Sequence, residues 1–261
     1  MLAQYESGAN LRSRVSVYEY LEPVPTGSVE FGPWVLDHIA WSGTEVALDV
    51  GGGPDSADPG LSARAARVVG LDISPGMLRE HRDGRPSTSF VQADAVDLPA
   101  RVGSFDVVLA AHMLYHLSDI ERALAEVRRV LRRGGAFLAS LNGATDKHEI
   151  RELWQESASK VLGASTRISH WSSRANLDNM PEVFEPQFAD ITVDRLAGRF
   201  RFPSPEPVLR WVASFRSGTE DAIDDDQWEA AMAELGRRVG DCVREHGELV
   251  VTKEGGVIVA R

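Results

Sequence analysis

The sequence predicts an α/β protein with a doubly wound sheet of about seven strands, mostly parallel, with an antiparallel strand at the C-terminal end. Three observations predict this fold. Short apolar segments alternate with amphipathic helical segments over residues 45–142. Glycines 51–53 follow the first apolar segment, and further apolar segments recur near the C-terminus. Strands joined in this order by helices form a parallel sheet.

The central part of the chain contains most of the expected strands. Each is a short apolar run, as is typical of buried strands. We expect these strands at 45–50, 67–73, 88–94, 105–111 and 136–142.

The helices between these strands have recognisable ends. Ser74 and Pro75 are favourable N-cap and N1 residues for the helix after the second strand. Ser118 and Glu121 predict a capping box for the helix after the fourth strand. Gly134 is expected to end that helix.

The flanking regions predict one domain with four parts. A stretch as long and irregular as 143–187 is more often a lid over a site than a linker. After it we expect strands at 190–196 and 199–202, two helices, and a final strand or hairpin. The four parts are a helical cap (1–44, with a helix at 34–40), a ligand-binding core (45–142), a lid or substrate segment (143–187), and C-terminal strands and helices (188–261).

The composition excludes some functions. The formal net charge of −11 over 261 residues would repel nucleic acid. There is no apolar run long enough to cross a membrane, and the first residues lack the parts of a secretory signal. The single cysteine, Cys242, cannot pair within the chain. We therefore expect a cytoplasmic protein with no nucleic-acid and no membrane partner, and we leave a homo-oligomer open.

Most of the basic residues are arginines. Three lysines stand against twenty-five arginines. We attribute this ratio to a GC-rich coding bias and not to a binding site.

The glycine loop raises the question of its ligand. Glycines let a backbone turn tightly at the carboxyl edge of a sheet, where ligands bind. The dinucleotide pattern G-x-G-x-x-G is incomplete because Ser56 takes the third glycine position, and no P-loop lysine follows. Asp55 would also repel a phosphate. The loop therefore favours a ligand without pyrophosphate.

Two carboxylates complete the pattern. Asp72 ends the second strand, twenty-one residues after Gly51, where a carboxylate can accept both hydroxyls of a ribose. Asp94 ends the third strand, where it can accept a hydrogen bond from an adenine amino group. Each acid could instead hold a turn or cap a helix. A ligand with adenosine and no phosphate satisfies the loop and both acids.

These segments resemble those of the class I S-adenosylmethionine-dependent methyltransferases of the small-molecule type, and the resemblance covers most of the chain. ALDVGGG (47–53) is similar to the family's acidic-x-Gly-x-Gly loop, and VVGLDISPGML (68–78) to its ribose-binding acid and helix. FVQADAVDLP (90–99) is similar to its adenine-binding segment. The most specific match is 104–140, which is similar to the fourth strand, the substrate-facing segment and the fifth strand. One departure is Asp55, where the family usually has a third glycine.

The resemblance implies a Rossmann-like fold, an enzyme, and S-adenosyl-L-methionine as cofactor. It implies transfer of a methyl group by in-line displacement to an oxygen or nitrogen of a small molecule, by analogy a specialised metabolite of natural product biosynthesis. The residues that it implies for cofactor binding are Tyr5, Arg14, Asp49, Gly51, Gly53, Asp72, Ile73, Met77, Asp94, Ala95 and Ala111.

The segment AAHMLYHLSD (110–119) lies where the fourth strand reaches the site. His112 and His116 would share one face of a helix, and either could serve as a base or only pack near the cofactor. Tyr115 could face the substrate or the core. We expect no metal, because no third ligand accompanies the histidines. In the predicted lid, His170 and Trp171 are candidate substrate contacts.

Three other functions stay open at this point. A nicotinamide-dependent oxidoreductase is disfavoured by the missing glycine and by the position of Asp94. A methyltransferase of nucleic-acid bases is disfavoured by the negative charge and by Ala-His-Met-Leu (111–114), which stands where such enzymes often have Asn/Asp-Pro-Pro-aromatic. A cofactor-binding protein without catalysis is suggested by Asp55.

Overall fold

A mixed sheet forms the centre of the molecule, which we describe from a computed structural model over residues 9–22, 30–52, 58–84, 89–163, 174–216 and 223–261. Its strands are β1 (Val46–Val50), β2 (Arg67–Asp72), β3 (Ser89–Gln92), β4 (Phe105–Ala111), β5 (Leu131–Asn142), β6 (Ile191–Phe202) and β7 (Leu249–Ala260). In this described part of the chain they form a seven-stranded sheet in the order β3-β2-β1-β4-β5-β7-β6. The pairs from β3 to β5 are parallel, and β7 is antiparallel to β5 and β6. The predicted fold class is confirmed.

The strand order reverses between β1 and β4, which are neighbours in the sheet. In doubly wound sheets, ligands bind at the carboxyl edge beside such a reversal. The fold therefore places the ends of β1 and β4 at the centre of the expected binding edge.

Helices cover both faces of the sheet. Apolar residues of α2 (Phe31–Leu36) and α3 (Asp58–Arg64) share one buried cluster with the sheet. Those of α5 (Ile120–Val130) and α7 (Met180–Phe184) share a second cluster on other strand residues. Along β1, β4 and β5 the buried side chains alternate between the two clusters, as strands buried on both sides require. The other short elements near the sheet are α4 (Pro75–Gly84) and the 3-10 helix η3 (Leu114–His116).

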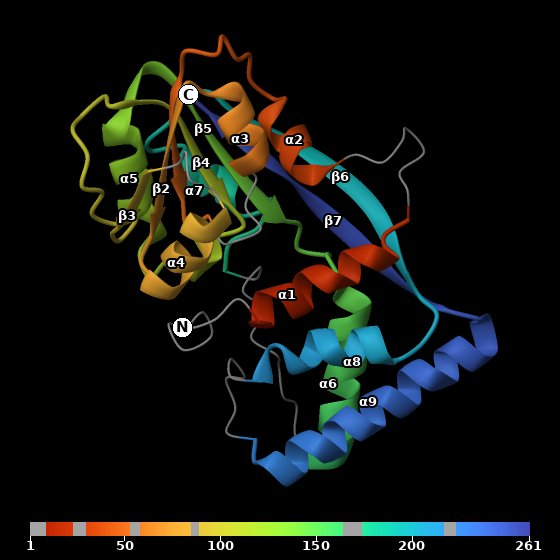
Figure 1. The fold of residues 1–261 in the computed structure, drawn as a ribbon. Helices are drawn as coiled ribbons and strands as arrows, with labels where there is room; N and C mark the ends of the chain where they lie inside the picture. The colour runs from red at the N-terminus through yellow and green to blue at the C-terminus, as the bar shows by residue number, and fades with distance from the viewer. Residues whose placement is uncertain (1–8, 23–29, 53–57, 85–88, 164–173, 217–222) are drawn as a thin grey trace.

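A separate group of helices lies beyond the carboxyl edge of the parallel strands, where the long strands β6 and β7 reach it (Figure 1). It consists of α1 (Ala9–Val15), the 3-10 helix η2 (Ser16–Tyr20), α6 (His148–Leu162), α8 (Glu206–Ala213) and α9 (Asp225–His246). A third apolar cluster, which includes Trp154, Phe200 and Trp211, holds most of these elements together. From the expected cap, α1 and η2 therefore lie in one helical group with α6 of the expected lid, whereas α2 covers a face of the sheet.

Two helix starts test the predicted caps. The hydroxyl of Ser74 accepts a hydrogen bond at 3.4 Å from the backbone N–H of Met77, the third residue of α4, which confirms that cap. For α5 the predicted capping box of Ser118 and Glu121 is wrong. The helix begins one residue later, and Asp119 accepts a hydrogen bond from the Arg122 N–H at 3.0 Å.

The predicted end of α5 is also wrong. The helix ends at Val130, several residues before Gly134. Leu131 is extended, pairs with Phe105 of β4 and is buried. Sheet pairing therefore ends the helix before the glycine can do so.

Three segments differ from their predicted form. Two are more regular than expected, and one begins and ends earlier than expected. β6 is one strand through Gly198, although two strands were expected there, because it pairs with β7 without interruption. β7 is a single strand and not a hairpin. α2 begins at Phe31 and does not span 34–40. Its first turn contains Pro33, where the missing N–H removes no helical hydrogen bond.

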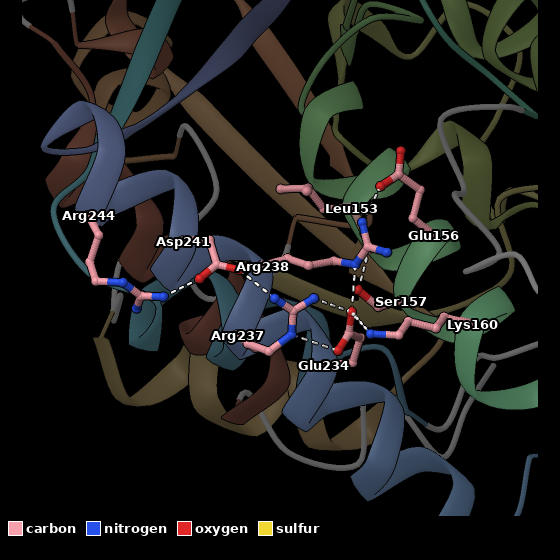
Figure 2. A network of polar contacts seen from close by, with 9 residues as sticks. All are labelled: Leu153, Glu156, Ser157, Lys160, Glu234, Arg237, Arg238, Asp241 and Arg244. Carbon is pink, nitrogen blue, oxygen red and sulfur yellow. Dashed lines mark hydrogen bonds and ion pairs between the residues drawn. The ribbon is translucent and has the colours of Figure 1, made fainter.

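An ion-pair network joins α6 and α9 (Figure 2). Glu234 accepts hydrogen bonds from Arg237, Arg238 and Lys160 at 2.6, 3.0 and 2.9 Å. Arg238 also binds Glu156 of α6 at 2.5 Å. The hydrogen bonds of Arg237, then those of Lys160 and Arg238, hold the pKa of Glu234 well below its usual value.

Candidate functional site

The loop after β1 is built around the buried side chain of Asp49. Gly51 has a left-handed φ of 66°, and its N–H donates to the Leu71 carbonyl of β2 at 2.7 Å. A Cβ on Gly52 would lie 2.2 Å from Asp49 Oδ2, and a Cβ on Gly51 would lie 3.0 Å from Met113 Cε. Both positions therefore require glycine, and the bare backbone forms a cradle over the carboxylate.

The two predicted acids lie at the same edge of the sheet. Asp72 ends β2 in register with Gln92, which ends β3, and Asp94 follows two residues later. Asp72 Oδ1 accepts from the Ser74 N–H at 2.8 Å, and Asp94 Oδ1 from the Val96 N–H at 3.1 Å. Each acid thus holds the turn after its strand. Burial raises the pKa of Asp72 more than this backbone hydrogen bond lowers it.

Four apolar residues predicted for the cofactor lie along this edge. Ile73 follows β2 and is 48% exposed. Met77, in the first turn of α4, and Ala95, directly after Asp94, are both buried. Ala111 ends β4 and is half-buried. Other predicted site residues lie outside the described ranges, and their roles stay predictions; these are Tyr5, Gly53, His170 and Trp171, together with the loop residue Asp55.

The spacing of His112 and His116 predicted that they share one face of a helix, but they do not lie on the same helix. His112 has a left-handed φ of 50°, and η3 begins only at Leu114. His112 stacks on Phe31 of α2 with ring centroids 5.3 Å apart. His116 lies edge-on to Tyr115 at 4.5 Å. The segment therefore turns sharply at the end of β4 and packs its rings on separate neighbours.

Both imidazoles are neutral at physiological pH. Burial lowers the pKa of His112 to about 3, and the nearby Lys253 adds to this effect. Burial, with a contribution from Arg14, likewise lowers the pKa of His116 to about 3. Such imidazoles accept a proton only weakly. A catalytic role for His112, His116 or Tyr115 stays a prediction.

Arg14 packs against the end of α8. Its guanidinium donates to Ser214 Oγ at 3.2 Å and to the Ser214 carbonyl at 2.8 Å, and lies 4.1 Å from the Phe215 ring centroid. Its predicted pairing with a cofactor carboxylate stays a prediction.

A buried group of charges on the other side of β4 was missed. Asp146, Lys147 and Lys253, which we name the lysine cluster, are each 5% exposed or less. Asp146 Oδ2 lies 2.6 Å from Lys147 Nζ, and Oδ1 lies 3.4 Å from Lys253 Nζ. Burial alone would raise the pKa of Asp146, but Lys147 and then Lys253 lower it, so the carboxylate is ionised.

The sequence contained a signal for this cluster. Two of the three lysines in the chain are members. Lysine is rarely buried unless it is paired. Coding bias explains why lysines are few, but it does not explain why two of the three lysines are buried.

The site therefore has two halves along the carboxyl edge. The ends of β1, β2 and β3 present the glycine cradle and two carboxylates, while β5, β7 and the start of α6 present the lysine cluster. The end of β4, with His112, lies between them. Among the described residues, no group of three His, Cys, Asp or Glu side chains is arranged to hold a metal ion. In the same ranges, no helix is both long and apolar enough to span a membrane.

Part of the chain matches a known family model. Residues 48–139, from β1 into β5, match the family model described as a methyltransferase domain. A demethylmenaquinone methyltransferase of Thermobifida fusca is 34% identical over 151 residues, covering 56% of this chain and 60% of that protein. The YcgJ protein of Bacillus subtilis has the same fold, with a TM-score of 0.58 at 16% identity over 87% of this chain and 96% of that one.

A second relative carries a different name. The mitochondrial arginine-hydroxylase NDUFAF5 of Danio rerio is 28% identical over 199 residues, covering 75% of this chain and 60% of that protein. The chain thus spans about 60% of the length of these two curated relatives.

Proposed function

Since the chain belongs to the class I S-adenosylmethionine-dependent methyltransferases, whose cofactor is S-adenosyl-L-methionine, we propose that it transfers the cofactor's methyl group to an oxygen or nitrogen of a small molecule. The observation that carries this proposal is the glycine cradle. A Cβ at Gly52 would collide with Asp49 Oδ2, so the loop backbone must pass close to this buried carboxylate. Asp72 and Asp94 at the same edge suit the ribose hydroxyls and the adenine amino group, and they disfavour pyrophosphate.

The chain's own residues supply position and a dry environment. Asp72 and the cradle hold the adenosine part, and the exposed Ile73 offers apolar surface beside it. The end of β4 then brings His112 and Tyr115 to the place where an acceptor would meet the cofactor's far end. When bound, the cofactor supplies an electrophilic methyl group on a sulfonium, so the protein needs to align the acceptor and exclude water.

The acceptor is proposed at the level of its class. The net charge of −11 disfavours nucleic acid. The curated relatives carry names of different substrates and reactions, so none of them defines the acceptor of this chain. We propose a small organic molecule of specialised metabolism. A cytoplasmic location and a homo-oligomer stay predictions.

The test is direct detection of transfer. The purified chain would be incubated with S-adenosylmethionine carrying a deuterated methyl group and with a library of phenols, amines and organic acids. Mass spectrometry should find S-adenosylhomocysteine together with a product that carries the labelled methyl group. Binding of S-adenosylhomocysteine with no labelled product would favour a non-catalytic cofactor-binding protein. Thermal stabilisation by a nicotinamide cofactor instead would overturn the proposal.

A further inference from the structure

A buried ammonium group lies on the acceptor side of the proposed site. Lys147 is the residue just before α6 and makes one side-chain hydrogen bond among the described residues, to Asp146 Oδ2 at 2.6 Å. The ring centroids of Phe200, Tyr18 and Trp211 lie 4.9, 5.7 and 5.9 Å from its Nζ. An ammonium has three donors. Two N–H groups of Lys147 therefore face aromatic rings and have no oxygen acceptor in these ranges.

Lys253 differs from Lys147 because oxygen atoms surround it. Its Nζ lies 2.9 Å from Asn142 Oδ1, 3.3 Å from the Glu254 carbonyl and 3.4 Å from Asp146 Oδ1. Gly255 makes room for it, since a Cβ there would lie 2.9 Å from this Nζ. Lys253 thus has a structural set of acceptors, and Lys147 does not.

The lysine cluster carries one excess positive charge. Its two ammonium groups face the single ionised carboxylate of Asp146. The nearby Glu254 side chain is engaged elsewhere, by Arg195 and Thr145, each at 2.6 Å. A buried charge without full compensation is unfavourable, and an anionic oxygen from a ligand would compensate it.

Accessible surface adjoins the cluster. Tyr18 is 37% exposed, although both Lys147 Nζ and Lys253 Nζ lie within 6 Å of its ring centroid. On the other side, the Phe31 ring lies 6.0 Å from Lys253 Nζ and stacks on His112 at the end of β4. The cluster is therefore one ring away from the strand end at which the acceptor and cofactor would meet.

We propose that Lys147 binds an anionic oxygen of the methyl acceptor, so that the acceptor is a small organic acid with an apolar body. Tyr18, the exposed ring beside the cluster, would border that body while the ammonium takes the carboxylate. This inference rests on the proposed function and names its substrate class. It assigns no proton transfer to Lys147.

The test compares two probes of the same shape. Binding of 4-hydroxybenzoate and of its neutral analogue 4-hydroxybenzamide would be measured by calorimetry on the full chain saturated with S-adenosylhomocysteine. The acid should bind about tenfold more tightly, as a hydrogen-bonded charge pair suggests. The variant Lys147→Met should show no such preference, and this variant should bind S-adenosylhomocysteine as tightly as the wild type does. Lys160→Met is the matched control, because Lys160 is 56% exposed and belongs to the Glu234 network; it should keep the preference.

Several outcomes would overturn the inference. Equal binding of both probes, no binding of either at millimolar concentration, or a preference that survives in Lys147→Met would each do so. A loss of S-adenosylhomocysteine affinity in Lys147→Met would assign the ammonium to the cofactor's carboxylate instead. If that variant does not fold, a crystal structure of the wild type with 4-hydroxybenzoate decides, by whether the carboxylate contacts Lys147 Nζ. Failure of the wild type to bind S-adenosylhomocysteine at all would instead overturn the proposed function.

Discussion

His112 combines two uncommon properties at one residue, a left-handed backbone and a buried neutral imidazole. Its pKa is lowered to about 3 in the folded protein, whereas in the unfolded chain it titrates near 6.5. The unfolded state therefore binds the extra proton between these values. Stability contributed by the neutral imidazole is complete above pH 6.5 and is lost as the pH falls toward 3.

We expect His112→Asn to weaken this pH dependence. Asparagine tolerates left-handed backbone and does not titrate. Between pH 7 and 5.5 the wild type should lose up to about 1.4 kcal/mol per pH unit for each such histidine. The variant should lose less, as measured by urea unfolding at several pH values. An identical slope in both proteins would show that His112 is protonated equally in the folded and unfolded states.

Gly52 is the residue on which the cradle depends most. A Cβ there would lie 2.2 Å from Asp49 Oδ2, so Gly52→Ala should destabilise the fold by about 1–3 kcal/mol through overpacking. Gly198→Ala is the control, since its Cβ would meet ordinary contacts at 3.5 Å or more. Chemical denaturation of the two variants measures the difference. Equal stability of both would mean that Asp49 moves away at no cost.

At the residue scale, the sequence predicts the position of a residue well when neighbours in the chain determine it, and poorly when distant segments do. Gly51, Asp72 and Asp94 lie at the carboxyl edge of the sheet, as expected, because each is at or just after the end of a strand, and their part in binding stays a prediction. Lys147 and Lys253 were missed because their partners come together only when α6 is packed against β7. Their rarity was visible in the sequence, but the burial that gives it meaning is a tertiary property.

At the scale of elements, Glu234 is the centre of the polar contacts between α6 and α9, which also share an apolar cluster (Figure 2). Glu234→Gln should destabilise the protein more than Glu156→Gln, because Glu234 binds three cations and Glu156 binds Arg238 alone among the contacts drawn. The difference in thermal midpoint between the variants should shrink in high salt, which screens these charges.

The same network has a predicted pH dependence. The pKa of Glu234 is lowered from 4.5 in the folded state, so its stabilising contribution is present above pH 4.5 and is lost as the pH falls below it. Urea unfolding of the wild type and of Glu234→Gln should therefore converge in acid. A constant difference down to acidic pH would contradict this assignment.

Element types were predicted better than element ends. The apolar segments located the seven strands of the sheet, with β6 expected as two, and the signal is strongest in β1 and β4, which are buried on both faces. The errors came where tertiary pairing overrides local signals. Pairing with β7 carries β6 through Gly198, and pairing with β4 draws Leu131 out of α5 before its glycine.

At the scale of the whole molecule, the strand order explains the division of the site. The strands on one side of the β1–β4 neighbours carry the cradle and the acids, and those on the other side carry the lysine cluster. The helical group lies beyond the same edge and supplies Tyr18 and Trp211 to the second half (Figure 1). One sheet thus brings the half that we propose for adenosine and the half that we propose for the acceptor together at the end of β4.

The central claim is that the carboxyl edge of β1, β2 and β3 binds an adenosyl ligand without phosphate. Calorimetric titration of the full chain with S-adenosylhomocysteine tests it most directly, with Asp72→Asn beside the matched control Asp190→Asn, whose residue lies near the start of β6 away from this edge. We expect the wild type and Asp190→Asn to bind alike and Asp72→Asn to bind about ten- to a hundredfold more weakly, since it loses a charged acceptor. Absence of binding by the wild type, or unchanged binding by Asp72→Asn, would contradict the account.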